Sequence, residues 1–220
     1  MIYALMNNQL DSVTMLAFIV GYVLAVMLAI VFHEFSHAFV AYKFGDPTPK
    51  FTGRLSLNPT KHFDALGFIS FLVVGFGWAK PVLTNPLNYR SFKKGQRWVA
   101  LSGIITNLVF AVLFSLLSYI LSPVLLASSN GFLLFIYFFI NYFCSINLAL
   151  AIFNLLPIYP LDGYNFLRTF LRPENSFVQV MERYGSFILF IVILTPFFDW
   201  FYSFAINGIL GGLDMFWGLF

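Results

Sequence analysis

The sequence predicts an all-α polytopic membrane protein with about four to six transmembrane helices. Hydrophobic residues make up 60% of the 220-residue chain and charged residues only 10%, whereas roughly 25% of residues are charged in an ordinary soluble domain. Apolar runs of about 20 residues, the length that a helix needs to cross a bilayer, recur along the chain. The expected organisation is a single integral membrane domain, residues 1–220, with no appended soluble domain.

Four apolar ranges are expected to span the membrane, and a fifth is ambiguous. The expected spans are residues 15–42, 98–121, 132–153 and 184–201. The range 204–220 contains Gly208, Gly211 and Gly212, which weaken a helix. It is expected to span the membrane, to lie along the interface or to pack against the bundle.

The range 65–79 is apolar but too short for an ordinary span. Glycines interrupt it, and Lys61 and Lys80 flank it. Basic residues at both ends of about fifteen residues indicate a segment that enters and leaves the membrane on one side. Because apolar residues alternate with glycines, this segment is expected to be re-entrant and β-hairpin-like.

The positions of the basic residues predict the orientation in the membrane. All twelve lysines and arginines fall in segments that the expected spans place on one side. By the positive-inside rule, that side is the cytoplasm, so a multi-pass protein of the cytoplasmic membrane is expected. The net charge of +3 therefore indicates contact with the lipid bilayer and its headgroups, and no nucleic acid partner is expected.

An H-E-x-x-H motif, His33 to His37, lies inside the first apolar range. Side chains four residues apart share one face of a helix, so His33 and His37 can bind one metal ion. Glu34 between them can act as a base toward water. Ionisable groups inside a spanning helix are costly and by default imply a functional site. The motif therefore predicts metal-dependent hydrolysis inside a membrane.

A catalytic zinc site needs a third protein ligand beside two imidazoles. Asp162 is the best candidate, because it follows a helix break at Pro157 and Pro160 and precedes Gly163, which permits a tight turn. The expected topology brings this segment and the H-E-x-x-H motif to a similar depth in the cytoplasmic half of the bilayer.

These two segments resemble the two sequence signatures of the site-2 protease family of intramembrane metalloproteases, peptidase family M50. The resemblance covers roughly residues 31–163 and is to the small stand-alone prokaryotic branch. It implies one Zn2+ ion held by His33, His37 and Asp162, with Glu34 catalytic. It also implies a membrane-protein substrate with a transmembrane segment, cut within or near that segment for regulated proteolysis or for clearance of signal-peptide remnants.

A peptide bond inside a helix is shielded by its own hydrogen bonds, so a substrate span must unwind before it can be cut. The hairpin-like range 65–79 could add the extended substrate as another strand. Asn107 and Asn154 are candidates to bind the substrate backbone or to help to orient the transition state.

Two other functions are compatible with the same residues. Two histidines and one carboxylate also hold iron in mononuclear non-haem oxygenases, although Glu34 would then have no obvious task. The non-enzymatic alternative is a metal-binding membrane scaffold or transporter. Cys144, the single cysteine, lies in an apolar stretch and is expected to be a packing residue.

Overall fold

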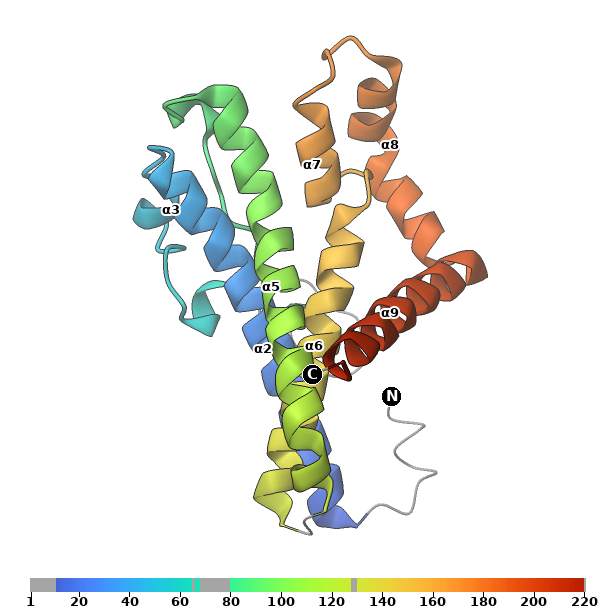
Figure 1. Cartoon of the computed structure of the whole chain (residues 1–220). Coiled ribbons are helices and arrows are strands. Elements are labelled where there is room, and N and C mark those ends of the chain that lie inside the picture. The colour runs from blue at the N-terminus through green and yellow to red at the C-terminus, as the bar shows by residue number, and fades with distance from the viewer. Residues whose placement is uncertain (1–10, 65, 68–79, 128–129, 220) are drawn as a thin grey trace.

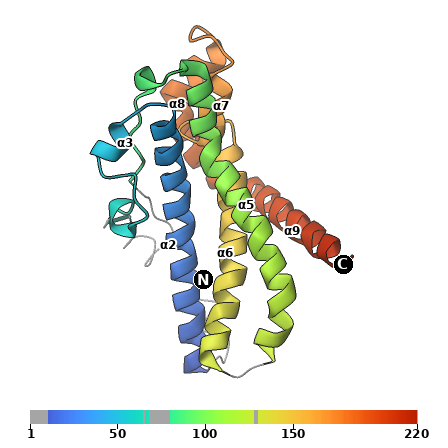
Figure 2. The same cartoon turned by 60° about the vertical axis from the view of Figure 1, so that its left-hand side comes forward.

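The computed structural model describes residues 11–64, 66–67, 80–127 and 130–219, which form helices and connecting segments with no β-strand among them. Three long helices, α2 (Ser12–Lys43), α5 (Phe92–Leu126) and α6 (Gly131–Leu155), pack side by side as the central bundle (Figures 1 and 2). The other helices are α3 (Thr48–Phe51), α7 (Asp162–Arg168), α8 (Ser176–Ile193), α9 (Pro196–Trp217) and the short 3-10 turns η1 (Pro59–Lys61) and η2 (Pro86–Asn88).

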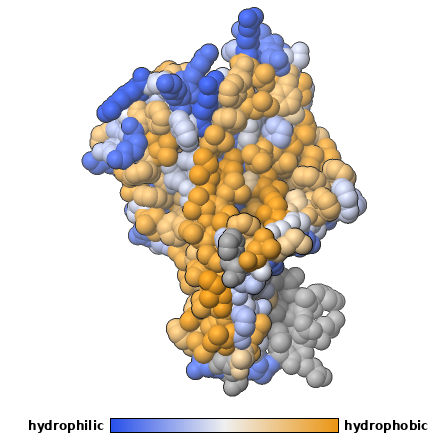
Figure 3. Space-filling model, viewed as in Figure 1, coloured by the Kyte–Doolittle hydropathy of each residue, from blue (hydrophilic) through white to orange (hydrophobic). Residues whose placement is uncertain are grey.

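Four of the described helices, α2, α5, α6 and α8, are long and apolar enough to cross a membrane. Over the part of the chain that the structure describes, this confirms the expected all-α class with four candidate spans. With 35 residues, α5 is about 52 Å long at 1.5 Å per residue, well beyond the roughly 30 Å of bilayer hydrocarbon. Its N-terminal turns, with Lys93, Lys94 and Arg97, can therefore extend out of the apolar layer. Hydrophilic side chains gather at this end of the molecule, whereas apolar side chains cover most of the remaining face (Figure 3).

The core of the bundle combines small residues on α2 with aromatic rings on α5 and α6. Ala25 and Ala29 are fully buried against Phe143 of α6. The ring of Phe143 lies 4.4 Å from that of Phe114 and 5.4 Å from that of Phe110, between ring centroids. Small residues let helices approach closely inside a membrane, and interlocked rings fix their relative rotation. The packing therefore sets which face of α2 meets α5.

The C-terminal helices differ from the expected spans. One span was expected over residues 184–201, but α8 ends at Ile193 and α9 begins at Pro196. Thr195 caps α9 by accepting the backbone N–H of Phe198 at 3.3 Å. Pro196 has no N–H and so cannot continue α8, but it suits the first position of a new helix.

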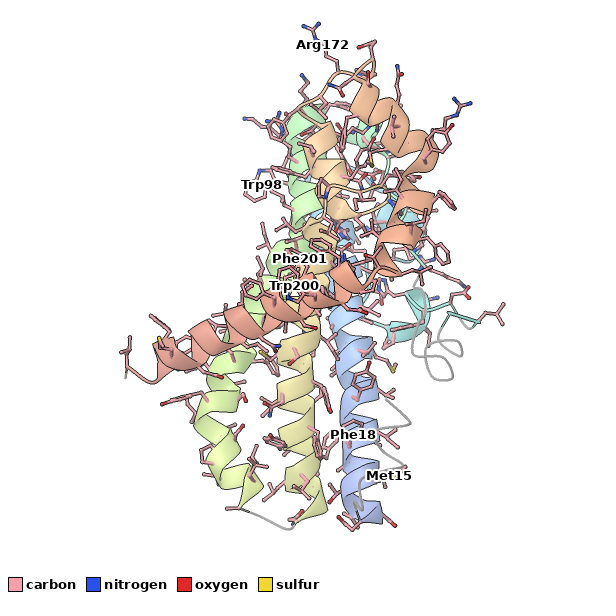
Figure 4. All side chains as sticks on the ribbon, turned by 90° about the vertical axis from the view of Figure 1, so that its right-hand side faces the viewer. Met15, Phe18, Trp98, Arg172, Trp200 and Phe201 are labelled. Carbon is pink, nitrogen blue, oxygen red and sulfur yellow. The ribbon has the colours of Figure 1, made fainter. Side chains whose placement is uncertain are left out.

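Helix α9 crosses the bundle obliquely and packs on α5 and α6, at the level where Trp200 and Phe201 lie in Figure 4. With 22 residues it is longer than α8, but it is not among the four described helices that are apolar enough to cross a membrane. Near its C-terminal end, the indole Nε1 of Trp217 donates to Ser115 Oγ of α5 at 3.0 Å. The described part of residues 204–220 thus packs on the bundle, and whether it also crosses the membrane stays a prediction.

Two further expectations concern connecting segments. The second span was expected to end at residue 121, but α5 continues to Leu126 with Pro123 inside the helix. A proline this close to a helix end removes one backbone hydrogen bond, and transmembrane helices tolerate this loss. The expected re-entrant hairpin, residues 65–79, lies outside the described residues except for residues 66–67.

Candidate metal centre

The two imidazoles of the H-E-x-x-H motif share one face of α2 and are buried against α5. His33 is 7% exposed and His37 is 8% exposed. Their rings lie 4.7 Å apart between centroids, and the two Nε2 atoms are 3.1 Å apart. Gly103 of α5 makes room for this arrangement, since a Cβ there would lie 2.4 Å from His33 Cε1.

Asp162 reaches the imidazoles because α7 begins immediately beside the end of α6. A Cβ at Gly163 would lie 2.3 Å from the carbonyl oxygen of Leu155, so this close approach of two backbones requires glycine. The fold-back places Asp162 Oδ2 3.2 Å from His33 Nε2 and 3.1 Å from His37 Nε2. The expected third ligand is thus brought to both histidines from more than a hundred residues away.

The three atoms have the spacing that a zinc ion needs. A tetrahedral ion with bonds of about 2.0–2.1 Å separates its ligand atoms by about 3.3–3.4 Å. Here His33 Nε2, His37 Nε2 and Asp162 Oδ2 are separated by 3.1–3.2 Å. Two imidazoles and one carboxylate are also the ligand types of catalytic zinc sites, which keep a fourth position for water. The residues present therefore fit one Zn2+ ion.

Hydrogen bonds on the far side of His37 determine which of its nitrogens faces the site. Its Nδ1 lies 2.7 Å from the carbonyl oxygen of Val99 on α5, and a carbonyl oxygen can only accept. Nδ1 therefore carries the proton, and Nε2 directs a lone pair toward Asp162. Lone pairs from three atoms so close together repel unless a cation, either a metal ion or a proton, lies among them.

The electrostatics at Asp162 depend on a positive charge beside it. Burial alone would raise the pKa of its carboxyl group, but protonated His37 and His33 outweigh burial and hold that pKa below its ordinary value of 3.8. A bound metal ion would take the place of those protons, and Asp162 would again be a carboxylate.

Glu34 and Asn154 line a cavity of about 900 Å³ together with His33, His37 and Asp162. Glu34 Oε2 accepts the backbone N–H of Val82 at 3.0 Å, which holds the carboxylate from the segment that precedes η2. Asn154, near the end of α6, donates through Nδ2 to the Leu150 carbonyl oxygen at 3.0 Å. The structure therefore brings Glu34 and Asn154 to the same cavity as the three candidate ligands.

Asn107 does not line this cavity, although the sequence predicts a contact with substrate. Its side chain is fully buried behind His33, with Nδ2 3.1 Å from His33 Nδ1. A side chain enclosed in this way contacts the imidazole and not a substrate in the cavity. The position therefore disfavours the predicted substrate contact.

Asp46 is a buried carboxylate that the sequence motifs do not identify. It is fully buried and accepts the backbone N–H of Asn85 at 2.6 Å, the side-chain amide of Asn88 at 2.9 Å and the hydroxyl of Thr48 at 2.6 Å. The short Asp46-Pro47-Thr48 sequence indicates a local turn, but no local pattern indicates the partners forty residues away. These bonds fasten the end of α2 to the segment that carries Val82.

Fold and site together define a class: polytopic membrane proteins with a buried two-histidine, one-aspartate zinc centre and an adjacent glutamate. A family model described as peptidase family M50 matches residues 117–193, which include Asp162. YwhC of Bacillus subtilis, named as a candidate zinc metalloprotease, is 37% identical over 178 residues, which cover 79% of this chain and 80% of YwhC.

Two relatives named Rip2, also described as candidate zinc metalloproteases, extend the comparison. Rip2 of Mycolicibacterium smegmatis is 29% identical over 89% of this chain and 79% of the relative. Rip2 of Mycobacterium tuberculosis is 28% identical over 80% of this chain and 68% of the relative. No solved structure matches the chain.

The chain belongs to peptidase family M50, the site-2 protease family, and is an intramembrane zinc metalloprotease. Zn2+ is accordingly its metal, and the group of His33, His37 and Asp162 could bind it. This membership decides against the two alternatives, the non-haem iron oxygenase and the non-enzymatic scaffold.

Proposed function

We propose that this metalloprotease hydrolyses peptide bonds within or near the transmembrane segments of other membrane proteins, from the cytoplasmic half of the cytoplasmic membrane. The observation that carries the proposal is the meeting of His33, His37 and Asp162 atoms within 3.2 Å of one another, beside Glu34 in one cavity. Ionisable groups at this depth are expected where a membrane protein performs chemistry.

Each residue of the site has a role in this proposal. His33, His37 and Asp162 hold the zinc ion, which when bound supplies a Lewis acid for the scissile carbonyl and for water. Glu34 is the general base and acid. The Val82 N–H holds Oε2 of Glu34 in place, and the carboxylate accepts the proton of the attacking water and then delivers it to the leaving amine.

Asn154 is proposed to bind the unwound substrate backbone. Its Nδ2 is engaged with the Leu150 carbonyl oxygen, so its Oδ1 is the atom that can accept a backbone N–H of the substrate. An unwound peptide needs such partners, because its backbone groups lose their helical hydrogen bonds inside an apolar layer.

The range 65–79 is proposed to form the re-entrant hairpin that offers a strand edge to the substrate. The described residues that flank it lie side by side, since the backbone N–H of Lys80 donates to the His62 carbonyl oxygen at 2.8 Å. The guanidinium of Arg54 also donates to the Lys61 carbonyl oxygen and, at 3.5 Å, to that of Lys80. Flanking residues that meet in this way support the proposal of a hairpin between them.

The cytoplasmic orientation is supported by the distribution of charge along the bundle. Lys93, Lys94 and Arg97 lie in the first turns of α5, and Arg172 lies beyond the same end of the bundle, opposite the end of α2 that carries Met15 and Phe18 (Figure 4). Basic segments are retained on the cytoplasmic side, and bilayers carry anionic lipid there.

The position of Trp98 supports the proposed depth of the zinc centre in the membrane. This exposed side chain precedes Val99, whose carbonyl oxygen holds His37. Tryptophan is enriched at the membrane interface. If Trp98 marks the interface, the zinc centre beside Val99 lies just below the membrane surface, where water can reach it.

The test compares the membrane proteins of cells that contain the wild-type enzyme or its Glu34→Gln variant. The variant keeps all three candidate ligands, so it should bind zinc as the wild type does but lose cleavage by at least about 100-fold, the usual contribution of a general base. Membrane fragments with uncut transmembrane segments should accumulate only with the variant.

Two further variants complete the comparison. His33→Ala should lose both zinc and cleavage, while Glu174→Gln, an exposed carboxylate outside the cavity, should behave as the wild type. Proteolysis that persists in a purified Glu34→Gln protein would reject the role of Glu34, and an unchanged set of membrane fragments would reject the substrate class.

A further inference from the structure

Asn107 is a fully buried amide for which the proposed mechanism has no task. It lies on α5 with Nδ2 3.1 Å from His33 Nδ1. Its Oδ1 is also buried and has no hydrogen-bond partner among the described residues. Leaving a buried polar atom without a partner costs about 1–3 kcal/mol. Such an atom beside a metal ligand indicates a hydrogen bond that forms when the ligand is engaged.

The chemistry of His33 specifies that hydrogen bond. When its Nε2 gives a lone pair to a metal ion, the remaining proton of the neutral ring is on Nδ1. Nδ1 must then donate, and the NH2 group of Asn107 cannot accept. A half-turn of the Asn107 carboxamide exchanges Nδ2 and Oδ1, two atoms of almost the same size. The rotation gives His33 Nδ1 an acceptor and pairs Oδ1, while the NH2 group, which faces a nitrogen that must then donate, moves to the position that Oδ1 occupied.

We propose that Asn107 is a positioning residue of the zinc centre, whose Oδ1 accepts the Nδ1–H of His33 and so fixes the tautomer and orientation of that ligand. Hydrogen bonds of this kind from a carboxamide, carboxylate or carbonyl to the outer nitrogen of a histidine ligand strengthen metal binding. This inference rests on the proposed role of His33 as a zinc ligand.

Asn107 belongs to a face of α5 that contacts both imidazoles. Val99, Gly103 and Asn107 are spaced four residues apart and therefore lie along one face of the helix. The Val99 carbonyl oxygen accepts the Nδ1–H of His37. Gly103 leaves space for the His33 ring, because a Cβ at this position would lie 2.4 Å from His33 Cε1. Asn107 completes this face by accepting the Nδ1–H of His33, as the Val99 carbonyl oxygen accepts the Nδ1–H of His37.

The test measures zinc affinity in the purified full chain, by competition with a chromophoric chelator in the absence of substrate. Asn107→Leu keeps the size of the side chain but removes the acceptor, so zinc should bind about 10- to 100-fold more weakly. Asn107→Asp supplies a carboxylate acceptor and should restore wild-type affinity or exceed it. A merely structural role for Asn107 would not produce this rescue.

Asn147 provides the matched control. It is a second fully buried asparagine, on α6, whose Oδ1 also has no partner among the described residues and which does not line the cavity. Asn147→Leu should leave zinc affinity unchanged. Thermal unfolding of the metal-free proteins shows whether each variant is folded before its affinity is compared.

Three results would overturn the inference: wild-type affinity in Asn107→Leu, equal weakening in Asn107→Leu and Asn147→Leu, or failure of Asn107→Asp to restore binding. A different result addresses the proposed function. If His33→Ala binds zinc as tightly as the wild type, His33 is not a ligand, and the proposed centre itself fails.

Discussion

Gly103 shows how one missing side chain allows the zinc centre to form. A Cβ at this position would lie 2.4–2.7 Å from three atoms of the His33 ring. Gly103→Ala should therefore displace the imidazole and weaken zinc binding by about tenfold or more, comparable to the loss of a supporting hydrogen bond. The chelator competition that tests Asn107 measures this directly.

Gly208 of α9 is the control for Gly103, because a Cβ there would meet no atom within 4 Å. Gly208→Ala should keep zinc affinity and, as a glycine-to-alanine change inside a helix, should stabilise α9 by up to about 1 kcal/mol. Unchanged zinc binding in Gly103→Ala would show that the His33 ring is not confined by α5.

At the residue scale, the sequence predicts the candidate ligands but not what supports them. His33, Glu34 and His37 form a local motif, and Asp162 is marked by the helix break before it and by Gly163 after it. The contact of Asn107 with His33 and that of Asp46 with Asn85 could not be predicted in the same way, although Asn107 was a candidate site residue, because each joins residues more than thirty positions apart along the chain. Only the folded structure supplies such partners.

At the element scale, Asp46 joins the end of α2 to the segment before η2, which carries the amide that holds Glu34. Its carboxylate accepts Asn85 N–H at 2.6 Å, three residues after Val82. Asp46→Ala should release this segment and lower cleavage by about tenfold, because a misplaced general base loses part of its contribution. Zinc affinity should stay near that of the wild type, since no ligand touches Asp46.

Single-turnover cleavage and zinc titration separate these two effects, with Glu174→Ala as the exposed control. If cleavage by Asp46→Ala equals that of the wild type, Val82 is held in place without Asp46. If zinc affinity falls together with cleavage, Asp46 supports the whole site and not only the segment beside Glu34.

The lowered pKa of Asp46 predicts that the stability of the protein depends on pH. Burial raises the pKa of Asp46, but hydrogen bonds from Asn88, Thr48 and the Asn85 backbone outweigh burial and lower the pKa below its ordinary value of 3.8. A lowered pKa in the folded state means that Asp46 adds stability above about pH 4 and loses it as the pH falls through the folded-state value. The thermal midpoint of the wild type should therefore exceed that of Asp46→Asn at pH 6, and the difference should shrink below about pH 4. A difference that is constant from pH 6 to pH 3 would contradict this assignment.

Helix boundaries were harder to predict than the existence of helices. The apolar runs predicted α2, α5 and α6 to within a few residues at most ends, because the bilayer requires long helices whatever their neighbours. The break between α8 and α9 could not be predicted from composition, because Thr195 and Pro196 stand inside one continuous apolar stretch. A capping hydroxyl and a proline, not a change in hydropathy, separate these helices.

At the scale of the whole molecule, the proposed orientation predicts which ends of the bundle face the cytoplasm. Cys144 is the single cysteine and is buried, so replacing it with alanine gives a background for site-directed labelling. In that background, Lys94→Cys at the start of α5 should react with a membrane-impermeant thiol reagent only when the cytoplasmic face is exposed. Ser12→Cys, at the start of α2, should react from the opposite face.

Both positions are exposed in the structure, so accessibility should depend on the side of the membrane and not on burial. Labelling of both cysteines from one side would contradict an odd number of crossings between them. The reversed pattern would place the zinc centre in the outer half of the membrane.

The account depends most on one zinc ion bound jointly by residues of α2 and α7. X-ray diffraction from the zinc-loaded protein, with anomalous data at the zinc absorption edge, locates that ion directly. We predict a single strong peak about 2.0–2.2 Å from His33 Nε2, His37 Nε2 and an Asp162 carboxylate oxygen. A zinc peak away from these three atoms, or coordination that leaves out Asp162, would contradict the account.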